Sequence, residues 1–399
     1  MKILFLLTLL ITKANAGGAF LYEVGIPDNG WAAAGRPAYA SDSSTVYGNP
    51  AGLSYLEKSE FMAGIQPKFA IIDFDNNSTP TSNDINLSAH FPGGSIFYAT
   101  KFSDKVGFGL GLLSFMGLAI DYGDHWEGKN WIEESAIVTL DLVPAFSYKF
   151  SDKFSLGLGL DILWGDIKQQ FGVEGVTSPA QLTYEDSKFG IGLNAGLLYN
   201  FSSKARLGMK WRSPIALDFQ DSPSFNNGLT LPSTKMDMTI PQELSVGLFF
   251  DTSDTLSLLL GFDWQNWEKF GEFTLQVGDT SAKALNANLE NTWNLSLGMI
   301  WAVAESEKLT FGLAYDSSAV EDANRTVMLP LAEQFRISAG YMVTFSDTRM
   351  FDFNFTFITS GDNNPVNMAR HPVLNRPGLT GNYDPYNVFA IGANYKWKF

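Results

Sequence analysis

The sequence predicts an all-β protein: a transmembrane antiparallel β-barrel of about fourteen strands with an N-terminal plug in its lumen. Three observations support this class. Apolar and polar residues alternate over long segments, short polar turns recur about every 50 residues, and only 17% of the 399 residues are charged, against about 25% in typical soluble domains. Aromatic residues reach 14% and glycine contributes 37 residues, which also suits an outer-membrane barrel.

The composition excludes several classes of function. The chain has no cysteine, so disulfides, thiol catalysis and cysteine metal sites are ruled out. Its net charge of −15 argues against a nucleic-acid partner, because a polyanion is bound by basic surfaces. Only three histidines occur, His90, His125 and His371, so we expect neither a histidine metal centre nor a cofactor.

Residues 1–16 have the composition of a secretory signal peptide. Lys2 gives a positive start, residues 3–11 are apolar, and residues 14–16 (Ala-Asn-Ala) form a small-residue cleavage site. About nine apolar residues are too few to cross a bilayer as a helix, and no other apolar run reaches the roughly 18 residues required. We therefore expect export, with Gly17 as the first mature residue, and insertion as strands into the cell outer membrane of a Gram-negative bacterium.

Residues 17–58 do not show the strand pattern. They are rich in Gly, Ala, Ser and Tyr, and Asn49-Pro50-Ala51-Gly52 breaks any strand because proline cannot donate a ladder hydrogen bond. A barrel of fourteen strands encloses a lumen wide enough to need filling or to hold water. We therefore expect residues 17–58 to form the plug, with Asn49 and Pro50 holding it inside the barrel. A disordered periplasmic tail and a simple turn are the alternatives.

Residues 59–399 carry the predicted barrel strands. Period-two alternation over about eight or more residues predicts a strand with one apolar face. Strands of about ten residues with aromatic ends suit a bilayer, whereas strands of soluble sandwiches are usually about five or six residues long. The clearest examples lie at residues 154–165, 309–316, 351–357 and 389–399.

The spacing of the turns predicts the number of strands. Six short polar turns lie at residues 102–105, 150–153, 201–204, 251–254, 305–308 and 345–348. Seven longer linkers lie between them, at residues 73–84, 121–133, 171–187, 220–236, 268–290, 317–333 and 361–386. These connections join fourteen strands and place both ends of the barrel on the short-turn side, the periplasm. The aromatic Phe399 ends the chain, and we expect the barrel-assembly machinery to recognise it.

An enzymatic function is not expected. A barrel lipase needs a nucleophile, a base and an orienting group that converge in space. The chain has no Gly-x-Ser-x-Gly elbow, and its three histidines lie in separate predicted elements. We interpret the acidic residues Glu133, Glu134 and Asp362 as solvated loop charges rather than as ligands of surface cations.

Passive uptake of hydrophobic molecules accounts for a plugged barrel better than an open pore does. Apolar solutes do not favour water, so a water-filled channel would not help them to cross. Phe225, Leu229 and Leu231 in one long loop are candidates for an apolar surface groove, with local loop packing as the alternative. Two other classes stay open: a non-selective porin, which would show steady porin-size conductance, and a surface adhesin barrel.

A series of motifs runs through nearly the whole chain: Gly18-Ala19-Phe20, Gly35, Asn49-Pro50-Ala51-Gly52-Leu53, Pro92, Gly107-Phe108-Gly109-Leu110-Gly111, Gly117-Leu118-Ala119, Ile240-Pro241-Gln242-Glu243-Leu244, Trp264, Trp267, Phe270, Leu329-Pro330 and Gly340-Tyr341. In this order they resemble the FadL/TodX family of outer-membrane transporters for long-chain fatty acids and other hydrophobic compounds. The chain departs from the family at residues 331–336, where members more often carry further acidic residues. The resemblance implies a fourteen-strand barrel with an N-terminal hatch, and hydrophobic small molecules as ligands.

The resemblance also places the extreme N-terminus against the ligand. Gly18, Ala19 and Phe20 are therefore expected to line an internal apolar pocket, and a disordered end is the alternative. An aromatic residue so close to a chain end needs a partner to stay ordered. Outer-membrane lipid and lipopolysaccharide are the expected surroundings of the barrel, which we expect to be a monomer.

The ligand is expected to leave sideways through the barrel wall. Release down the lumen would expose its apolar surface to water, at about 25 cal/mol per Å². Pro92 lacks a ladder donor, and Gly93 and Gly94 add no side chains that would block an opening. Gly117 interrupts the third strand, and in the resembled family a kink in that strand forms such an opening, where residues 117–119 resemble the family sequence. Bulges that only shape the barrel are the alternative.

Overall fold

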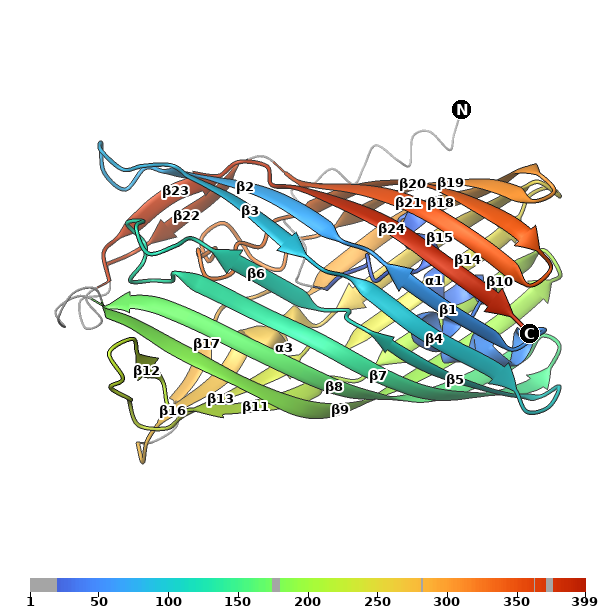
Figure 1. Ribbon diagram of the computed structural model, residues 1–399, viewed down its shortest axis with the longest axis horizontal. Helices are drawn as coiled ribbons and strands as arrows, with labels where there is room; N and C mark the ends of the chain where they lie inside the picture. The colour runs from blue at the N-terminus through green and yellow to red at the C-terminus, as the bar shows by residue number, and fades with distance from the viewer. Residues whose placement is uncertain (1–19, 174–179, 281–282, 362, 371–375) are drawn as a thin grey trace.

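The structure is a computed structural model that describes residues 20–173, 180–280, 283–361, 363–370 and 376–399. The strands form one closed antiparallel barrel of 14 strands, tilted against its long axis (Figure 1). The predicted fold class is therefore confirmed. The signal peptide predicted at residues 1–16 lies outside the described residues.

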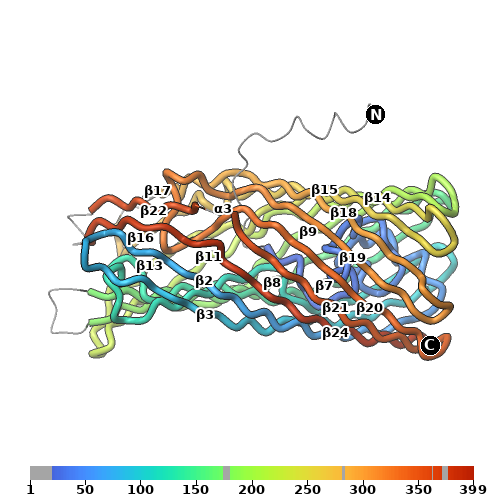
Figure 2. Tube along the Cα trace, turned by 90° about the horizontal axis from the view of Figure 1, so that it is seen from above, coloured from blue at the N-terminus to red at the C-terminus, as the bar shows by residue number. Residues whose placement is uncertain are grey.

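Many barrel strands are interrupted and consist of two segments. The uninterrupted strands are β7 (Glu134–Ser151), β8 (Phe154–Val173), β9 (Ala180–Ser202), β19 (Glu307–Asp316) and β20 (Gln334–Ser346). The interrupted strands are β1 (Glu60–Ile65) with β2 (Lys68–Asn76), β3 (Ile85–Phe91) with β4 (Gly94–Lys101), β5 (Val106–Leu113) with β6 (Gly117–Asp121), β10 (Ala205–Arg212) with β11 (Ile215–Asp221), β13 (Thr234–Ile240) with β14 (Glu243–Asp251), β15 (Leu256–Gln265) with β16 (Glu272–Val277), β17 (Lys283–Asn286) with β18 (Thr292–Ala304), β21 (Arg349–Ser360) with β22 (Asn364–Met368), and β23 (Leu379–Tyr383) with β24 (Asn387–Lys398). The pairing of β1 with β24, which sets Glu60 opposite Lys398, closes the barrel (Figure 1), and β2, which follows β1, lies beside β24 in Figure 2.

The connections follow the predicted asymmetry, but several predicted loops are partly strand. The six short turns lie at one end of the barrel, as expected. At the other end β8 and β9 extend into the predicted loop 171–187, and β16 and β17 form a hairpin within the predicted loop 268–290. Predicted loop 361–386 likewise contains the β22–β23 hairpin. These extensions lie beyond the apolar belt, where lipid no longer requires one face of a strand to be apolar, so their sequence need not alternate.

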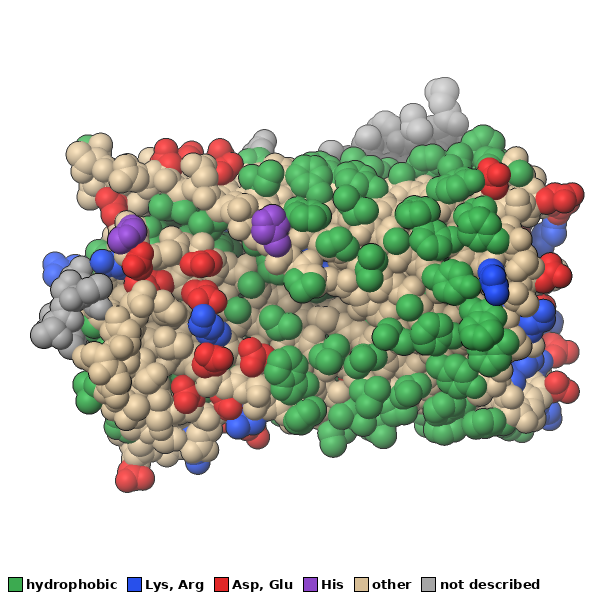
Figure 3. Space-filling view, viewed as in Figure 1, with side chains coloured by type: hydrophobic (Ala, Val, Ile, Leu, Met, Phe, Trp, Pro, Cys, Tyr) green, Lys and Arg blue, Asp and Glu red, His purple; other side chains and the backbone are tan. Residues whose placement is uncertain are grey.

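The outer face of the barrel is apolar over the half nearest the short turns (Figure 3). In β8, Leu156, Leu158 and Leu160 are exposed on the outside, whereas Gly157 and Gly159 between them are buried inside. This alternation gives the barrel the apolar belt that a bilayer requires, and it is the pattern from which the strands were predicted.

In the part of the chain that the structure describes, four short helices precede the barrel strands and a fifth lies between β15 and β16. They are η1 (Pro27–Trp31), α1 (Arg36–Tyr39), α2 (Thr45–Gly48), η2 (Pro50–Tyr55) and α3 (Trp267–Gly271). Within the described ranges, no helix combines the length and the apolar content needed to cross a membrane.

Residues 20–58 lie inside the barrel, in the half nearest the short turns (Figure 1). Trp31, Ala34 and Leu53 are completely buried there. Gly208 and Gly312 on the barrel wall allow this close approach. A Cβ atom at Gly208 would collide with the backbone of Pro37, and one at Gly312 would collide with the backbone of Trp31. Inward glycines therefore make room for the N-terminal segment.

Buried ion pairs fix this segment to the wall. Asp42 accepts a hydrogen bond from Lys396 of β24 at 3.0 Å, and Glu23 lies 2.6 Å from the guanidinium of Arg336 in β20. Burial alone would raise the pKa of the Asp42 carboxyl, but Lys396 and Ser44 outweigh burial and hold that pKa below its ordinary value. The segment is thus held by charge pairs as well as by apolar packing.

Candidate functional site

Three neighbouring barrel strands are interrupted at the same level. The breaks fall at residues 66–67, 92–93 and 114–116. Their common level follows from the register, which sets Ile65 opposite Gly94 and the next residue of β4 opposite the last residue of β5. Prolines stand in the first two breaks, where a missing N–H donor ends a ladder.

The wall between the second and third barrel strands is open above these breaks, that is, on their long-loop side. Below them, β4 and β5 pair continuously up to Ser95 opposite Leu113. Above them, β3 is paired with β2 and β6 is paired with β7, and no ladder in the described part of the chain joins β3 to β6. Two unpaired strand edges therefore face each other where the sequence predicts the lateral opening.

The N-terminal segment occupies the kink of the third strand. The Leu21 amide donates to the Phe115 carbonyl at 2.7 Å, and Phe20 forms an isolated antiparallel bridge with Met116. The Thr139 hydroxyl of β7 donates to the Met116 carbonyl, also at 2.7 Å. Backbone groups that the kink removes from the barrel ladder are thus satisfied by the N-terminal segment and by a side chain.

A cavity of about 210 Å³ lies behind the open wall. Three of the predicted site residues line it: Phe20, Pro92 and Gly117. Most of its other lining residues are apolar: Leu21, Ala70, Ile72, Phe91, Leu118, Ala119, Val138, Pro330, Leu331, Ile358 and Val388. The cavity therefore connects the N-terminal segment with both strand breaks and suits an apolar ligand.

The other predicted site residues of the opening lie beside this cavity. Gly94 begins β4 and packs against Gly25, where an added Cβ on Gly25 would lie 2.9 Å from the Gly94 Cα. The Gly93 carbonyl accepts a hydrogen bond from the Gln66 amide at 2.7 Å. These two glycines thus bring the N-terminal segment and the first strand close to the break. Gly18 and Ala19 lie outside the described residues.

Phe20 sits in an aromatic cluster at the inner side of the cavity. Its ring centroid lies 5.5 Å from that of Phe115 and 5.2 Å from that of Trp267, with edge-to-face geometry in both pairs. The Arg212 guanidinium stacks on the Phe115 ring, 4.0 Å from its centroid. Such packing orders an aromatic side chain near a chain end.

Replacing Phe20 with Ala is expected to weaken amphiphile binding about tenfold, because a buried aromatic side chain contributes roughly 1.5–3 kcal/mol. Equilibrium binding of a radiolabelled fatty acid to the purified protein measures the effect. Phe201→Ala is the matched control, since Phe201 is 52% exposed at the short-turn end. Unchanged binding in Phe20→Ala would remove Phe20 from the ligand site.

The Asn49-Pro50-Ala51-Gly52 motif lies inside the barrel against β8 and β9. The Asn49 amide donates to the carbonyls of Pro37 at 2.7 Å and of Leu197 in β9 at 2.9 Å. Its oxygen accepts from the Ala51 amide at 3.1 Å, which caps η2. One side chain thus joins two parts of the N-terminal segment to the barrel wall.

Replacing Asn49 with Ala is expected to loosen this segment by about 2–3 kcal/mol, because two buried carbonyls and one amide lose their partner. Conductance in planar bilayers should rise, and fatty-acid uptake should fall. Asn200→Ala is the control, since the Asn200 side chain donates to the Asp152 carbonyl at the exposed rim, away from the N-terminal motif. A correctly inserted Asn49→Ala protein with normal conductance and uptake would make the motif a simple turn.

The sequence did not single out the polar residues of the cavity. Lys68, Gln334 and Tyr386 line it alongside the apolar residues. Lys68 stands in period two with Ala70, opposite in phase to the outward-facing apolar residues of β2, so the alternation contained a signal for an inward lysine. No such pattern marks Gln334 or Tyr386, which meet only through the fold, with the Gln334 amide 3.0 Å from the Tyr386 hydroxyl.

Glu133 is buried and accepts hydrogen bonds from Gln170 and Gln181, so its interpretation as a solvated loop charge is wrong, whereas Asp362 lies outside the described residues. Phe225 pairs with Leu182 of β9 in the short strand β12 (Ser224–Phe225), and Leu229 is 57% exposed. Across the described ranges, no cluster of three or more acidic or histidine side chains is arranged to hold a metal ion.

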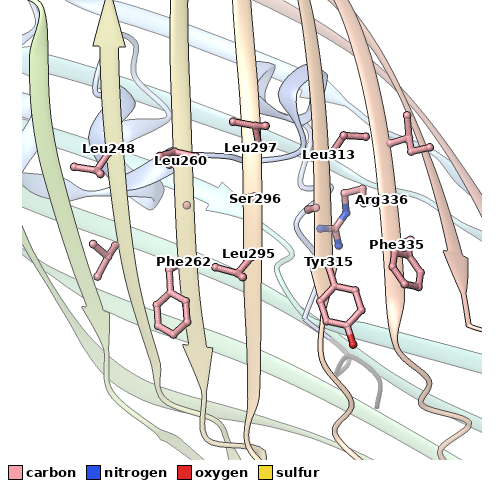
Figure 4. A pocket seen from close by; sticks show the side chains of 14 residues that line it. Leu248, Leu260, Phe262, Leu295, Ser296, Leu297, Leu313, Tyr315, Phe335 and Arg336 are labelled. Carbon is pink, nitrogen blue, oxygen red and sulfur yellow. The ribbon is translucent and has the colours of Figure 1, made fainter. Parts of the chain in front are cut away.

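A further hollow of about 710 Å³ is a groove on the outer wall (Figure 4). Its rims are outward-facing apolar side chains such as Leu260, Leu297 and Leu313, and its floor contains the small residues Ser296 and Ala314. Because the groove is open to the bilayer side of the wall, acyl chains of membrane lipid can fill it. It is therefore separate from the internal cavity.

Known proteins resemble this chain over nearly its whole length. A family model described as "Outer membrane protein transport protein (OMPP1/FadL/TodX)" matches residues 7–399. The long-chain fatty acid transport protein of Escherichia coli K12 is 23% identical over 405 residues, covering 88% of this chain and 89% of that protein. Outer membrane protein P1 of Haemophilus influenzae is 23% identical over 445 residues and covers 96% of both chains.

Solved structures agree on the fold. A FadL homologue of Pseudomonas aeruginosa superposes with a TM-score of 0.85 at 18% identity, covering 96% of this chain and 100% of that one. The toluene transporter TodX of Pseudomonas putida superposes with a TM-score of 0.69 at 14% identity, covering 96% and 99%. At these identities the likeness shows a shared barrel.

Proposed function

The chain belongs to the OMPP1/FadL/TodX family of outer membrane transport proteins, and from this premise we propose that it carries out passive uptake of long-chain fatty acids or other hydrophobic small molecules. It is a protein of the cell outer membrane of a Gram-negative bacterium. The ligand enters from the long-loop end and leaves sideways through the barrel wall into the membrane.

The observation that supports this function best is the internal cavity beside the unpaired edges of β3 and β6. Phe20, Pro92 and Gly117 meet in this cavity although they lie far apart in sequence. Gly117 has no side chain, and a Cβ added there would meet only two atoms, both beyond 3.5 Å. A molecule in the cavity is therefore separated from the bilayer by little protein at this point.

Lateral release is favoured by the physics of apolar solutes. A ligand that continued down the lumen would meet residues 20–58 first and periplasmic water afterwards, and exposing its chain to water costs about 25 cal/mol per Å². A ligand that moves between β3 and β6 passes from an apolar cavity into apolar lipid. The N-terminal segment, which bonds to the kink at Phe115, is placed to respond to the ligand there.

The domain boundaries and the further partners belong to the same proposal. Residues 1–16 serve as the signal peptide, residues 17–58 as the plug, and residues 59–399 as the barrel. The barrel works as a monomer in outer-membrane lipid and lipopolysaccharide, after insertion by the barrel-assembly machinery. Its named relatives are transport proteins, and we expect no catalytic activity.

Uptake by cells tests the proposal. A strain that lacks the gene should lose uptake of radiolabelled long-chain fatty acid or of a labelled aromatic hydrocarbon, and expression of the wild-type chain should restore it. If the wild-type chain is inserted in the membrane but restores uptake of neither compound, the proposed function is contradicted. Steady porin-size conductance of the purified protein would favour the porin instead.

A further inference from the structure

The break in the third barrel strand is a β-bulge. Below the break the ladder with β7 ends at Leu113 opposite Asp141, and above it the ladder restarts at Gly117 opposite Val138. Three residues of the third strand therefore stand opposite two residues of β7, which is itself uninterrupted. An extra residue of this kind bends its strand and disrupts the local ladder, so the bulge is what separates β6 from the line of β5.

Two different parts of the protein bind the backbone of this bulge. From inside the barrel, the Leu21 amide of the N-terminal segment donates to the Phe115 carbonyl at 2.7 Å. From the wall, the Thr139 hydroxyl of β7 donates to the Met116 carbonyl, also at 2.7 Å. The Ser114 hydroxyl lies 3.5 Å from the same carbonyl, at the limit of a hydrogen bond, so Thr139 is its main partner.

The position of Thr139 makes this hydrogen bond valuable. Thr139 belongs to a continuous strand, its side chain lies on the inner face, and only 1% of the residue is exposed. A buried carbonyl that loses its partner is unfavourable, and at membrane depth no bulk water replaces that partner. The hydroxyl therefore stabilises the bulged form of the third strand over forms in which residues 114–116 shift.

We propose that Thr139 is the positioning residue of the lateral opening: its hydroxyl holds the bulge at Met116, so that the barrel wall itself keeps β6 away from β3. The opening then persists when the N-terminal segment leaves the kink. This inference rests on the proposed lateral release and names the residue that maintains its route. The N-terminal segment controls access to the opening from inside the barrel and is not needed to form it.

Crosslinking across the opening in purified protein tests the proposal. The register, carried past the breaks with the one-residue shift of the bulge, sets Ser88 of β3 opposite Asp121 of β6, and both residues are exposed. Cysteines at these two positions report the width of the opening through the shortest bifunctional thiol reagent that links them. Thr139→Val keeps the shape of the side chain and removes the hydroxyl. In this background it should increase linking by the shortest reagents about fivefold to tenfold, the change in population expected for one buried hydrogen bond.

A second variant removes the other hydrogen bond of the bulge. Leu21→Pro deletes the amide that donates to Phe115, because proline has no backbone N–H. The pattern of linking should stay that of the chain with Leu21, since Thr139 still holds the bulge. This variant is scored by crosslinking alone, because Leu21 also lines the cavity. If Leu21→Pro favours the short reagents and Thr139→Val does not, the N-terminal segment holds the opening and the proposal is overturned.

Uptake by cells adds a functional measurement. Thr139→Val should lower the rate of radiolabelled dodecanoate uptake about fivefold to tenfold, while equilibrium binding of dodecanoate to the purified protein stays within about twofold. Thr139→Ser keeps the hydroxyl and should restore uptake and the original pattern of linking. Thr234→Val is the matched control, because the Thr234 hydroxyl donates to the Pro232 carbonyl at 3.2 Å beside β13, away from the opening. Thr139→Ala replaces Thr139→Val if valine impairs insertion.

The outcomes separate this inference from the proposed function. An inserted and folded Thr139→Val protein with unchanged linking and unchanged uptake would overturn the role of Thr139 and leave hydrophobic uptake intact. Absence of uptake by the wild-type chain would contradict the proposed function, and the crosslinking of Thr139→Val and Leu21→Pro would still decide which part of the protein holds the opening.

Discussion

A covalent link between β3 and β6 is expected to stop uptake. The register of β4 and β5, with Ser95 opposite Leu113, can be extended past the breaks. With the one-residue shift between the β5–β7 and β6–β7 ladders included, it places Ala89 of β3 opposite Ile120 of β6. Cysteines at these two positions, joined by bifunctional thiol reagents of increasing length, would bridge the open wall. The native chain has no cysteine, so the reagent reacts at the two introduced sites alone.

Uptake should fall to the level of cells without the protein when the short reagent is used, and it should recover when a reducible reagent is cleaved. A longer reagent should block less, because it leaves room for a hydrocarbon chain. The control pair is Ile96→Cys with Leu112→Cys, since these residues are already opposite each other in the hydrogen-bonded wall below the opening. Full uptake with β3 and β6 linked would place the exit elsewhere.

Removal of residues 20–56 is expected to convert the barrel into an open channel. These residues fill the short-turn half of the lumen, and a barrel of fourteen strands without them has room for water. Lys396 and Arg336 would lose Asp42 and Glu23, but water entering the lumen would solvate both cations. The barrel ladder, which does not involve these residues except at the kink, should remain intact.

Planar-bilayer recordings measure the result. Wild type should show little steady current, and the deletion protein should show a steady conductance of porin size that falls with added polymer able to enter the pore. Two controls show whether the barrel is folded: the circular dichroism spectrum, and the resistance of the unheated protein to unfolding in detergent. A folded deletion protein that conducts no more than wild type would contradict the assignment of residues 20–58 as a plug.

The strand pattern was readable from the sequence because one physical requirement acts on every strand that crosses a bilayer. Outward side chains meet lipid and inward side chains meet the plug or water, so residues such as Leu158 and Gly157 must alternate. The short turns at the other end carry their own polar signal. The extensions of β8 and β9 beyond the bilayer carry no such signal, since no lipid requires one of their faces to be apolar, and there the sequence suggested loops.

The site was only partly readable. Pro92 and Gly117 stood out because each breaks a local rule of strand composition. Lys68 obeys the spacing of an inward residue, but nothing in its neighbours along the chain shows that it lines a cavity together with Glu23. That placement depends on the fold, which also sets Glu23 2.6 Å from Arg336, more than 300 positions away in the sequence.

The sequence by itself therefore determined the barrel, its strand number and the interruptions at Pro92 and Gly117, because these depend on local periodicity and on residues that do not suit a regular strand. The tertiary structure alone decided that three breaks stand at one level, that Phe20 bridges to Met116 at the kink, and that a cavity forms behind them. The physical reason is the register of the strands. Register fixes which distant residues face each other inside the barrel, and it is set by the closure of all fourteen strands rather than by any one segment.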